Sequence, residues 1–129
     1  MTSCVFCDIC NSNSERIVRA NETAIAIYDA YPLNPGHALI IPKRHIGSFF
    51  SALPDERADL LALLDQMKAE LDTSLAPHGY NIGINDGPAA GQTVPHLHIH
   101  LIPRHEGDTQ DPRGGVRWVL PDKAAYWNE

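Results

Sequence analysis

The distribution of apolar and polar residues along the chain predicts several short β-strands. Residues 16–19 and 24–28 are short apolar or alternating runs on either side of an Asn-Glu pair, which predicts a β-hairpin. Residues 31–36 are rich in turn-forming types and end this pair of strands. Residues 37–42 (His-Ala-Leu-Ile-Ile-Pro) are predicted to form a buried strand, and residues 80–85 another.

One long helix is predicted in the middle of the chain. It begins at Pro54, which is followed by two acidic residues, as is typical of a first helical turn. Its apolar residues recur at helical spacing and predict one buried face: Leu60, Leu64, Met67 and Leu71. Pro-His-Gly at residues 77–79 ends the pattern. Strands separated by short turns, together with one long helix, predict an α+β domain with an antiparallel sheet.

The most informative pattern is the alternation in residues 96–102, His-Leu-His-Ile-His-Leu-Ile. Side chains two apart in a strand share a face, so His96, His98 and His100 are predicted to stand in a row. The aliphatic residues between them then point into the core. Near neutral pH an imidazole can act as a nucleophile, a proton carrier or a metal ligand. The alternative is a half-buried strand that carries three solvated histidines.

Length and composition are those of an ordinary globular domain. The 129 residues predict a single domain over 1–129. A formal net charge of −6 argues against general nucleic-acid binding, which needs a basic face, but leaves an anionic small ligand possible. No segment resembles a signal peptide or a bilayer-spanning run. The three cysteines all lie within residues 4–10, a spacing that favours metal binding over a set of disulfide bonds. Because disulfides are typical of oxidising compartments, we expect a cytoplasmic protein.

The loop at residues 85–95 has the composition of an anion-binding segment. Its glycines let backbone N–H groups approach an anion, and Gln92 and Thr93 add hydrogen-bond donors. A surface loop between two strands would have a similar composition. Because three histidines on one face follow directly, the sequence predicts a phosphate-sized site beside a nucleophile.

These motifs resemble those of the histidine-triad (HIT) superfamily. Residues 86–94 followed by the three histidines and Pro-Arg look like its signature, and residues 35–43 resemble its second motif. The resemblance covers about residues 4–104, with 105–129 as an irregular tail. It implies an antiparallel sheet of about five strands, one main helix and a short N-terminal helix. It also implies pairing into a homodimer.

The resemblance implies a nucleotide hydrolase that acts at the α-phosphorus through a nucleotidyl-histidine intermediate. His98 matches the nucleophile of the family, and the other catalytic positions are His100, His37 and Gln92. The matching substrate positions are Asp29 for the ribose, Asn85, Gly91 and Thr93 for the phosphate pocket, and Phe6, Ile9 and Ile27 for the base. The last three are explained equally well as core residues.

The amino-acid sequence of the loop at residues 85–95 is most similar to that of the fragile-histidine-triad branch of the superfamily. We therefore expect a diadenosine tri- or tetraphosphate hydrolase that releases AMP. Two alternatives share the same residues. One is a nucleoside phosphoramidase or adenylate-removing hydrolase, and the other is a zinc-stabilised nucleotide-binding module with incidental hydrolysis. Residues 111–118 depart from that branch. In one interpretation, Arg113 and Arg117, together with Arg104, reach the distal phosphates and Trp118 stacks on a base. In the other, the segment is an ordered surface tail.

Cys4 and Cys7 have the two-residue gap that is typical of tetrahedral metal sites. Zinc-carrying members of the superfamily take two further ligands from positions that match His45 and His96. The resemblance therefore implies a structural zinc held by these four residues, with Cys10 as a bystander. Two alternatives for these cysteines are less well supported. A redox-active dithiol is expected between a strand and a helix, and that arrangement is not predicted here. An iron–sulfur cluster that also used Cys10 would lack a fourth cysteine.

Overall fold

The computed structural model describes residues 3–127, and its strands form one antiparallel sheet. The strand order is β1-β2-β3-β5-β4, which confirms the predicted α+β fold. The strands are β1 (Ile17–Ala20), β2 (Ala24–Tyr28), β3 (Ala38–Pro42), β4 (Gly79–Gly83) and β5 (Ile99–Arg104). The helices are α1 (Val5–Asn11), α2 (Pro54–Leu75) and α3 (Pro121–Ala124), with 3₁₀ turns η1 (Phe49–Ser51), η2 (Pro88–Ala90) and η3 (Gly115–Val119).

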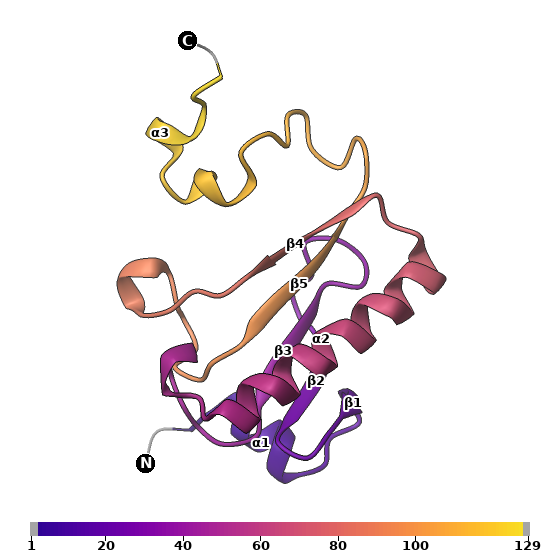
Figure 1. The fold of residues 1–129 in the computed structure, drawn as a ribbon, viewed down its shortest axis with the longest axis vertical. Coiled ribbons are helices and arrows are strands. Elements are labelled where there is room, and N and C mark those ends of the chain that lie inside the picture. Colours follow the sequence, from indigo (N-terminus) through magenta and orange to yellow (C-terminus); the bar gives the residue numbers. More distant parts are fainter. Residues whose placement is uncertain (1–2, 128–129) are drawn as a thin grey trace.

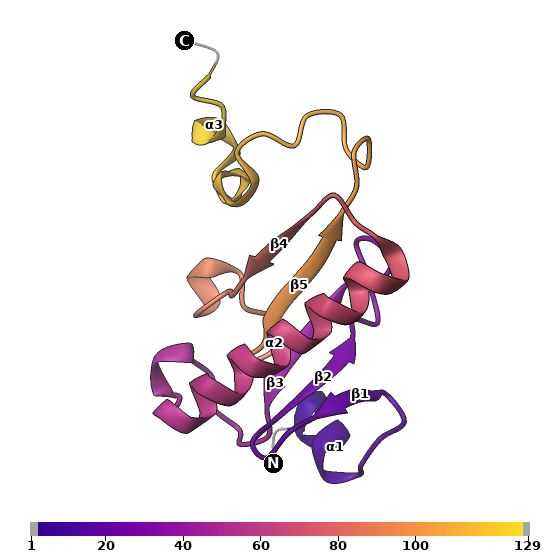
Figure 2. The same ribbon diagram turned by 45° about the vertical axis from the view of Figure 1, so that its right-hand side comes forward.

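Helices cover both faces of the sheet around β2 and β3. The long helix α2 runs across one face, and the short helix α1 lies at the other face near β2 (Figures 1 and 2). In β2, Ala24 and Ala26 pack in the cluster under α2, whereas Ile25 and Ile27 pack with Phe6 of α1. This two-sided burial explains why β2 is continuously apolar instead of alternating.

The buried face of α2 differs by one position from the predicted face. Leu60, Leu63, Met67 and Leu71 are fully or almost fully buried, whereas Leu64 is only partly buried at the edge of the same cluster. The first turn is fixed by Glu56, whose carboxylate accepts from the backbone N–H of Leu53 at 2.8 Å. The same carboxylate pairs with Arg44 at 2.7 Å.

The strand that carries the histidines begins later than predicted. β5 starts at Ile99, so His100 lies in the strand, while His96 lies in a bend and His98 in the irregular segment between that bend and the strand. The late start of β5 is caused by backbone hydrogen bonds to residues outside the ladder with β3. The backbone N–H of Leu97 donates to the carbonyl of Ile46 at 2.7 Å, and His96 donates to Val94, so this segment leaves the ladder with β3. The predicted faces nevertheless hold, because Leu97, Ile99 and Leu101 are buried in the cluster under α2.

The turn before β3 requires glycine. Gly36 has φ +86°, and a Cβ atom there would lie 2.7 Å from Leu75 Cδ1 and 2.8 Å from Leu71 Cδ2. The end of α2 therefore packs directly on the backbone that precedes His37. This contact fixes the entry into β3 and with it the position of that histidine.

The C-terminal segment is more ordered than the predicted irregular tail. It carries η3 and α3, and it folds back beyond β4 (Figure 2). Trp118 Nε1 donates to the carbonyl of Arg113 at 2.8 Å, and Arg117 donates to the carbonyls of Ala124 and Lys123 at 2.9 and 2.7 Å. η3 contacts β4. Within residues 3–127, none of the helices combines the length and the apolar character needed to cross a membrane.

Candidate catalytic and metal sites

His98 is the central histidine of the row, and its ring is enclosed. The ring centroids of Phe6 and His100 lie 5.2 and 5.1 Å from that of His98. The residue is only 8% exposed. A side chain so enclosed has one available orientation, which pre-organises it for chemistry.

The hydrogen bond of His98 selects the tautomer of its neutral ring. Its Nδ1 lies 2.8 Å from the carbonyl oxygen of His96, and a carbonyl can only accept, so the proton is on Nδ1. The Nε2 atom then carries the free lone pair. Among the described residues it has no hydrogen-bond partner, and the one buried side-chain nitrogen or oxygen without a partner there is Arg57 Nε. His98 Nε2 is therefore reached by solvent, as a nucleophile must be.

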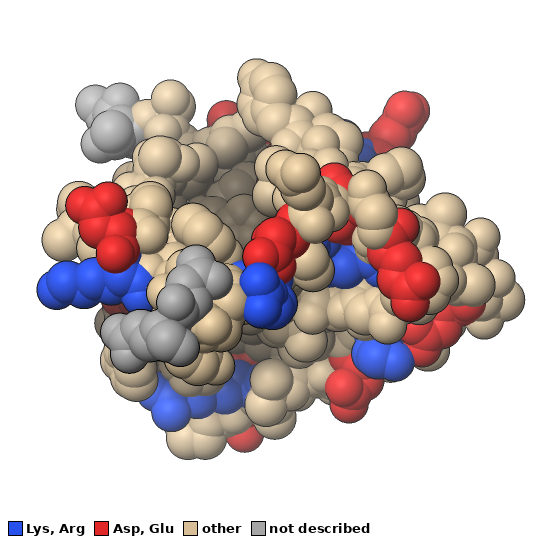
Figure 3. Space-filling model, turned by 90° about the horizontal axis from the view of Figure 1, so that it is seen from above, with Lys and Arg blue, Asp and Glu red and all other residues tan. Residues whose placement is uncertain are grey.

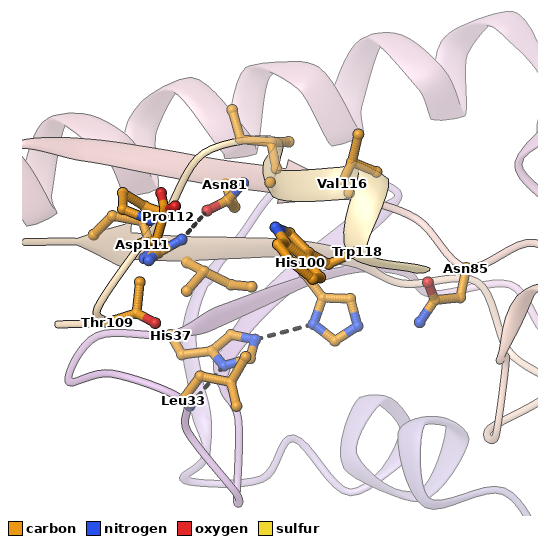
Figure 4. A pocket seen from close by; sticks show the side chains of 15 residues that line it. Leu33, His37, Asn81, Asn85, His100, Thr109, Asp111, Pro112, Val116 and Trp118 are labelled. Atoms are coloured by element: carbon orange, nitrogen blue, oxygen red, sulfur yellow. Dashed lines mark hydrogen bonds between the residues drawn. The ribbon is translucent and has the colours of Figure 1, made fainter. Parts of the chain in front are cut away.

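His37 and His100 form a second ordered pair. The backbone N–H of Leu33 donates to His37 Nδ1 at 3.1 Å, so the proton of His37 is on Nε2. That Nε2–H donates to His100 Nδ1 at 3.0 Å, which places the proton of His100 on its own Nε2. His100 therefore keeps one N–H donor that no described residue occupies. Figure 4 shows the two rings facing each other across this bond.

Both rings are neutral at neutral pH. Burial lowers the pKa of His37, although nearby Asp29, whose Oδ2 is 3.5 Å from His37 Nε2, opposes the shift. Burial and the neighbouring His98 and His37 lower the pKa of His100 to about 4. A neutral His100 is needed for the bond to His37, because a protonated ring cannot accept at Nδ1.

The lowered pKa of His100 predicts a loss of stability in acid. Between its usual pKa of 6.5 and its folded value of about 4, the unfolded chain binds more protons at this site, so stability falls as pH falls. At about pH 4.5 the cost should be on the order of 2 kcal/mol relative to neutral pH, allowing for partial solvent screening. Urea unfolding of wild type and His100→Asn across this range measures it. Asn keeps an acceptor for His37 but does not titrate, so parallel pH profiles for the two proteins would contradict the prediction.

The four predicted metal ligands converge. Their ligand atoms all lie within 4.8 Å of one another. Cys4 Sγ is 3.3 Å from His96 Nδ1, Cys7 Sγ is 3.2 Å from His45 Nδ1, and the two Nδ1 atoms are 3.1 Å apart. The edges of a tetrahedral zinc site should measure roughly 3.3–3.8 Å with the usual Zn–S and Zn–N bond lengths. The cluster is therefore close to the size that one zinc ion needs.

The chemistry of the donors also fits a metal ion. His96 is fully buried, and its Nε2 lies 2.8 Å from the carbonyl of Pro42, so Nε2 carries the proton and Nδ1 offers its lone pair to the cluster. Partial burial and the adjacent Cys4 raise the pKa of the Cys7 thiol to about 11. Paired thiolates in this position require a neighbouring cation. Cys10 instead packs against the core cluster beneath α1.

A second group of possible ligands, Asp29, His37 and His100, does not fit a metal ion. Its atoms also lie within 4.8 Å of one another. However, His37 Nδ1 accepts from the Leu33 N–H, so His37 Nε2 carries a proton and has no lone pair to offer. The structure therefore supports a metal site at the cysteines and a proton-ordered pair at His37 and His100.

The predicted substrate residues are spread around these two centres. Asp29 Oδ1 accepts from the backbone N–H of Tyr31 at 2.9 Å, so its other oxygen faces His37. The side chains of Phe6, Ile9 and Ile27 are buried together in the core cluster beneath α1. Their predicted contact with a base stays a prediction, as does the ribose contact of Asp29.

Gln92 holds the loop of residues 85–95 in place. Its Oε1 accepts from the Gly87 N–H at 2.8 Å, and its amide donates to the carbonyls of Gly47 and Val94 at 2.9 and 3.1 Å. A catalytic contact of this side chain therefore requires an exchange of one of these bonds. Thr93 and Gly91 are exposed on the same loop, and Gly91 has φ +94°.

A cavity of about 690 Å³ extends from the histidine pair along β5. His37, His100 and Asn85 line it together with Val116 and Trp118 of the C-terminal segment (Figure 4). The sequence prediction did not include several of its apolar and polar walls, namely Leu33, Asn81, Ile82, Ile102, Thr109 and Pro112. The alternation that selected His100 also selects Ile102, so that residue could have been found.

The arginines near this cavity are already paired. Arg104 donates to both oxygens of Asp108 at 2.8 and 2.7 Å and to Asn81 Oδ1 at 2.6 Å. Arg113 pairs with Asp111 at 3.0 Å. On the face seen in Figure 3, basic and acidic side chains are interspersed. Arg104, which lines the cavity, is therefore already paired, and contacts of these arginines with distal phosphates stay a prediction.

Comparisons with known proteins identify relatives of this chain. Residues 11–107 match the family model for the HIT domain. An uncharacterised HIT-like protein of Mycoplasma genitalium is 40% identical over 106 residues, 81% of this chain and 75% of that protein. The asymmetrical bis(5′-nucleosyl)-tetraphosphatase of Schizosaccharomyces pombe is 39% identical over 83 residues, 64% of this chain and only 46% of that enzyme. A zinc-bound histidine triad family protein from Mycobacterium smegmatis superposes with a TM-score of 0.76 at 36% identity, covering 84% of this chain and 80% of that one.

Proposed function

The chain belongs to the HIT domain family, and from this premise we propose that it hydrolyses nucleotides at the α-phosphorus through a covalent intermediate on His98. The observation that supports this most strongly is the hydrogen bond from His98 Nδ1 to the carbonyl of His96. In the neutral ring this bond leaves the Nε2 lone pair solvent-reached and in a fixed orientation, so attack requires no separate base.

The proposed reaction has two displacements. His98 Nε2 attacks the α-phosphorus, the N–P bond forms, and the bond from phosphorus to the leaving group breaks. The N–H of His100 donates to a phosphoryl oxygen and stabilises the charge that develops there. The leaving group departs with the electron pair of its bond to phosphorus, as a phosphate anion or, for an amine, with a proton taken from solvent. Water then attacks the phosphorus and releases a proton to solvent, the N–P bond breaks with its electron pair returning to Nε2, and His98 is again in its neutral tautomer as a nucleoside monophosphate leaves.

We propose zinc as the metal at Cys4, Cys7, His45 and His96, which would hold it with two thiolates and two imidazoles. Such an ion supplies a structural cross-link and leaves no open position for substrate. The zinc-bound relative from Mycobacterium smegmatis supports this assignment.

Hydrolysis in oxygen-labelled water tests the proposed route. Because water attacks the nucleotidyl-His98 intermediate, all of the label is expected in the monophosphate, and mass spectrometry of the products measures it. Label in the departing product would show direct attack of water at another phosphorus and would rule out this mechanism.

Two leaving groups are candidates. The name of the fission-yeast relative supports a dinucleoside polyphosphate, and with adenosine substrates AMP would be released. The cavity supports a nucleoside phosphoramidate or another leaving group with little charge, because Leu33, Ile82 and Ile102 line it and Arg104 is already paired with Asp108.

A matched substrate panel separates the two candidates. If the paired arginines determine the choice, kcat/KM for an adenosine phosphoramidate with an apolar amine should exceed that for diadenosine tetraphosphate by at least about tenfold. Arg104→Gln should then change neither value more than about threefold. The reverse preference, with a strong loss for tetraphosphate in the variant, would support the dinucleotide instead. No turnover of either, with retained nucleotide binding, would support the third alternative, a binding module with incidental hydrolysis.

The homodimer and the cytoplasmic location remain proposals. β4 forms one edge of the sheet, and Ile82 on it is 55% exposed, which is compatible with pairing to a second copy. The location is supported by the cysteine content.

A further inference from the structure

His96 belongs to the metal cluster and to the catalytic centre at once. Its Nδ1 lies 3.3 Å from Cys4 Sγ, while its backbone carbonyl accepts the Nδ1–H of His98 at 2.8 Å. The bond from its Nε2 to the carbonyl of Pro42 restrains the ring on the opposite side. Because the side chain is fully buried, a displacement at the cluster has no solvent-filled space to absorb it and must reach this carbonyl.

Phe6 provides a second connection. It lies between Cys4 and Cys7 in the sequence, and its ring meets the rings of His96 and His98 edge-on, with centroids 5.8 and 5.2 Å apart. Helix α1 has only seven residues, and Cys4 caps its N-terminus. A helix of this length is marginal by itself, so the cysteine ligands and the packing of Phe6 in the cluster beneath α1 together fix where Phe6 lies.

A third connection runs from His45 to the loop at residues 85–95. The carbonyl of Ile46 accepts from the Leu97 N–H at 2.7 Å, and the carbonyl of Gly47 accepts from the Gln92 amide at 2.9 Å. The two residues that follow His45 are thus bonded to the residue before His98 and to the loop beside it. Both ends of the predicted phosphate site are tied to one metal ligand.

We propose that the cluster of Cys4, Cys7, His45 and His96 sets the geometry of the nucleophile, with His96 and Phe6 as positioning residues that hold His98 in its Nδ1–H tautomer. The proposal rests on the proposed function in taking His98 as the nucleophile. The alternative hypothesis is that the cluster contributes only to the global stability of the fold. Loss of positioning should lower kcat about 10- to 100-fold, with KM changed less than about threefold, at a temperature where the protein remains folded.

The tautomer of His98 can be observed without substrate. Long-range proton–nitrogen NMR of full-length, histidine-labelled protein at about pH 8, where the rings are neutral, distinguishes the two tautomers of each imidazole. With zinc bound, His98 should show only the Nδ1–H form. After removal of zinc by a chelator, its signals should shift toward a mixture with the Nε2–H form, and zinc added back should restore the first spectrum.

A variant that keeps all four ligands covers the case in which the zinc-free chain unfolds. Phe6→Leu should retain zinc in the same ratio as wild type and yet show mixed His98 tautomers. Val5→Ala, at an exposed neighbour on the same helix, should show the wild-type spectrum. An unchanged Nδ1–H tautomer in Phe6→Leu overturns the proposal, as does an unchanged tautomer in folded zinc-free protein or a wild type that binds no zinc. A tautomer that responds in a protein without hydrolytic activity would leave the positioning link intact and reject the proposed function.

Discussion

Replacement of His98 by alanine is expected to lower kcat at least about a thousandfold, because the covalent route is lost with the nucleophile. Nucleotide binding should change little, since the ring of His98 is enclosed by Phe6 and His100 and the remaining donors of the site stay in place. Single-turnover kinetics on the preferred substrate measure the effect. In wild type, quenching with alkaline denaturant, in which the N–P bond survives, followed by mass spectrometry should also trap a nucleotidyl adduct on the chain, and the variant should form none.

The matched control for this experiment is His78→Ala. His78 is an exposed loop histidine beside His105, and it lies outside both sites. Its replacement should leave kcat within about twofold of wild type, as for an ordinary surface change. Turnover by His98→Ala within tenfold of that control would refute covalent catalysis by this residue.

Replacement of Cys4 by serine is expected to abolish zinc binding and to lower the free energy of unfolding by at least about 3 kcal/mol. For a chain of this size, the melting temperature should then fall by roughly 10 °C or more. Elemental analysis of protein purified without added metal should give about one zinc per wild-type chain and almost none for the variant. Calorimetry on the same samples gives the melting temperatures.

Cys10→Ser is the matched control, because it makes the same chemical change on the same helix outside the cluster. It should retain zinc and lose no more than about 1 kcal/mol. Equal zinc content in Cys4→Ser and Cys10→Ser, with equal melting temperatures, would show that the cysteine pair plays no part in stability.

The sheet and the row of histidines could be predicted from the alternation of residues, because burial on one face imposes that period directly. The tautomers of these histidines could not. They depend on the Leu33 N–H, which orders His37, and on the carbonyl of Pro42, which orders His96, and both come from other parts of the chain. The late start of β5 has the same origin, since Ile46 takes the backbone bond of Leu97. Local periodicity carries no information about such partners.

Contacts of the arginines with distal phosphates stay a prediction. Positive charges near a predicted phosphate site suggested contacts with distal phosphates, whereas the structure pairs Arg104 with Asp108 and Arg113 with Asp111. Both acceptors are close in the sequence, so short-range charge pairing was visible there. Trp118 of η3 was a candidate to stack on a base, whereas the wall formed by Val116 could not be foreseen, because it arises only when the C-terminal segment folds back on the sheet.

The cluster joins Cys4 to His96, residues separated by 92 positions, so a bound ion closes most of the chain into one loop. In the chain-entropy model, closing a loop of that length in the unfolded state is worth about 4.6 kcal/mol, near the upper end for a cross-link in a chain this short. The two cysteines are useful to the fold only after residues 42–46 and 96 have been brought together by the sheet. We therefore expect the N-terminal helix to dock after the sheet has formed and to open first when an ion leaves the cluster.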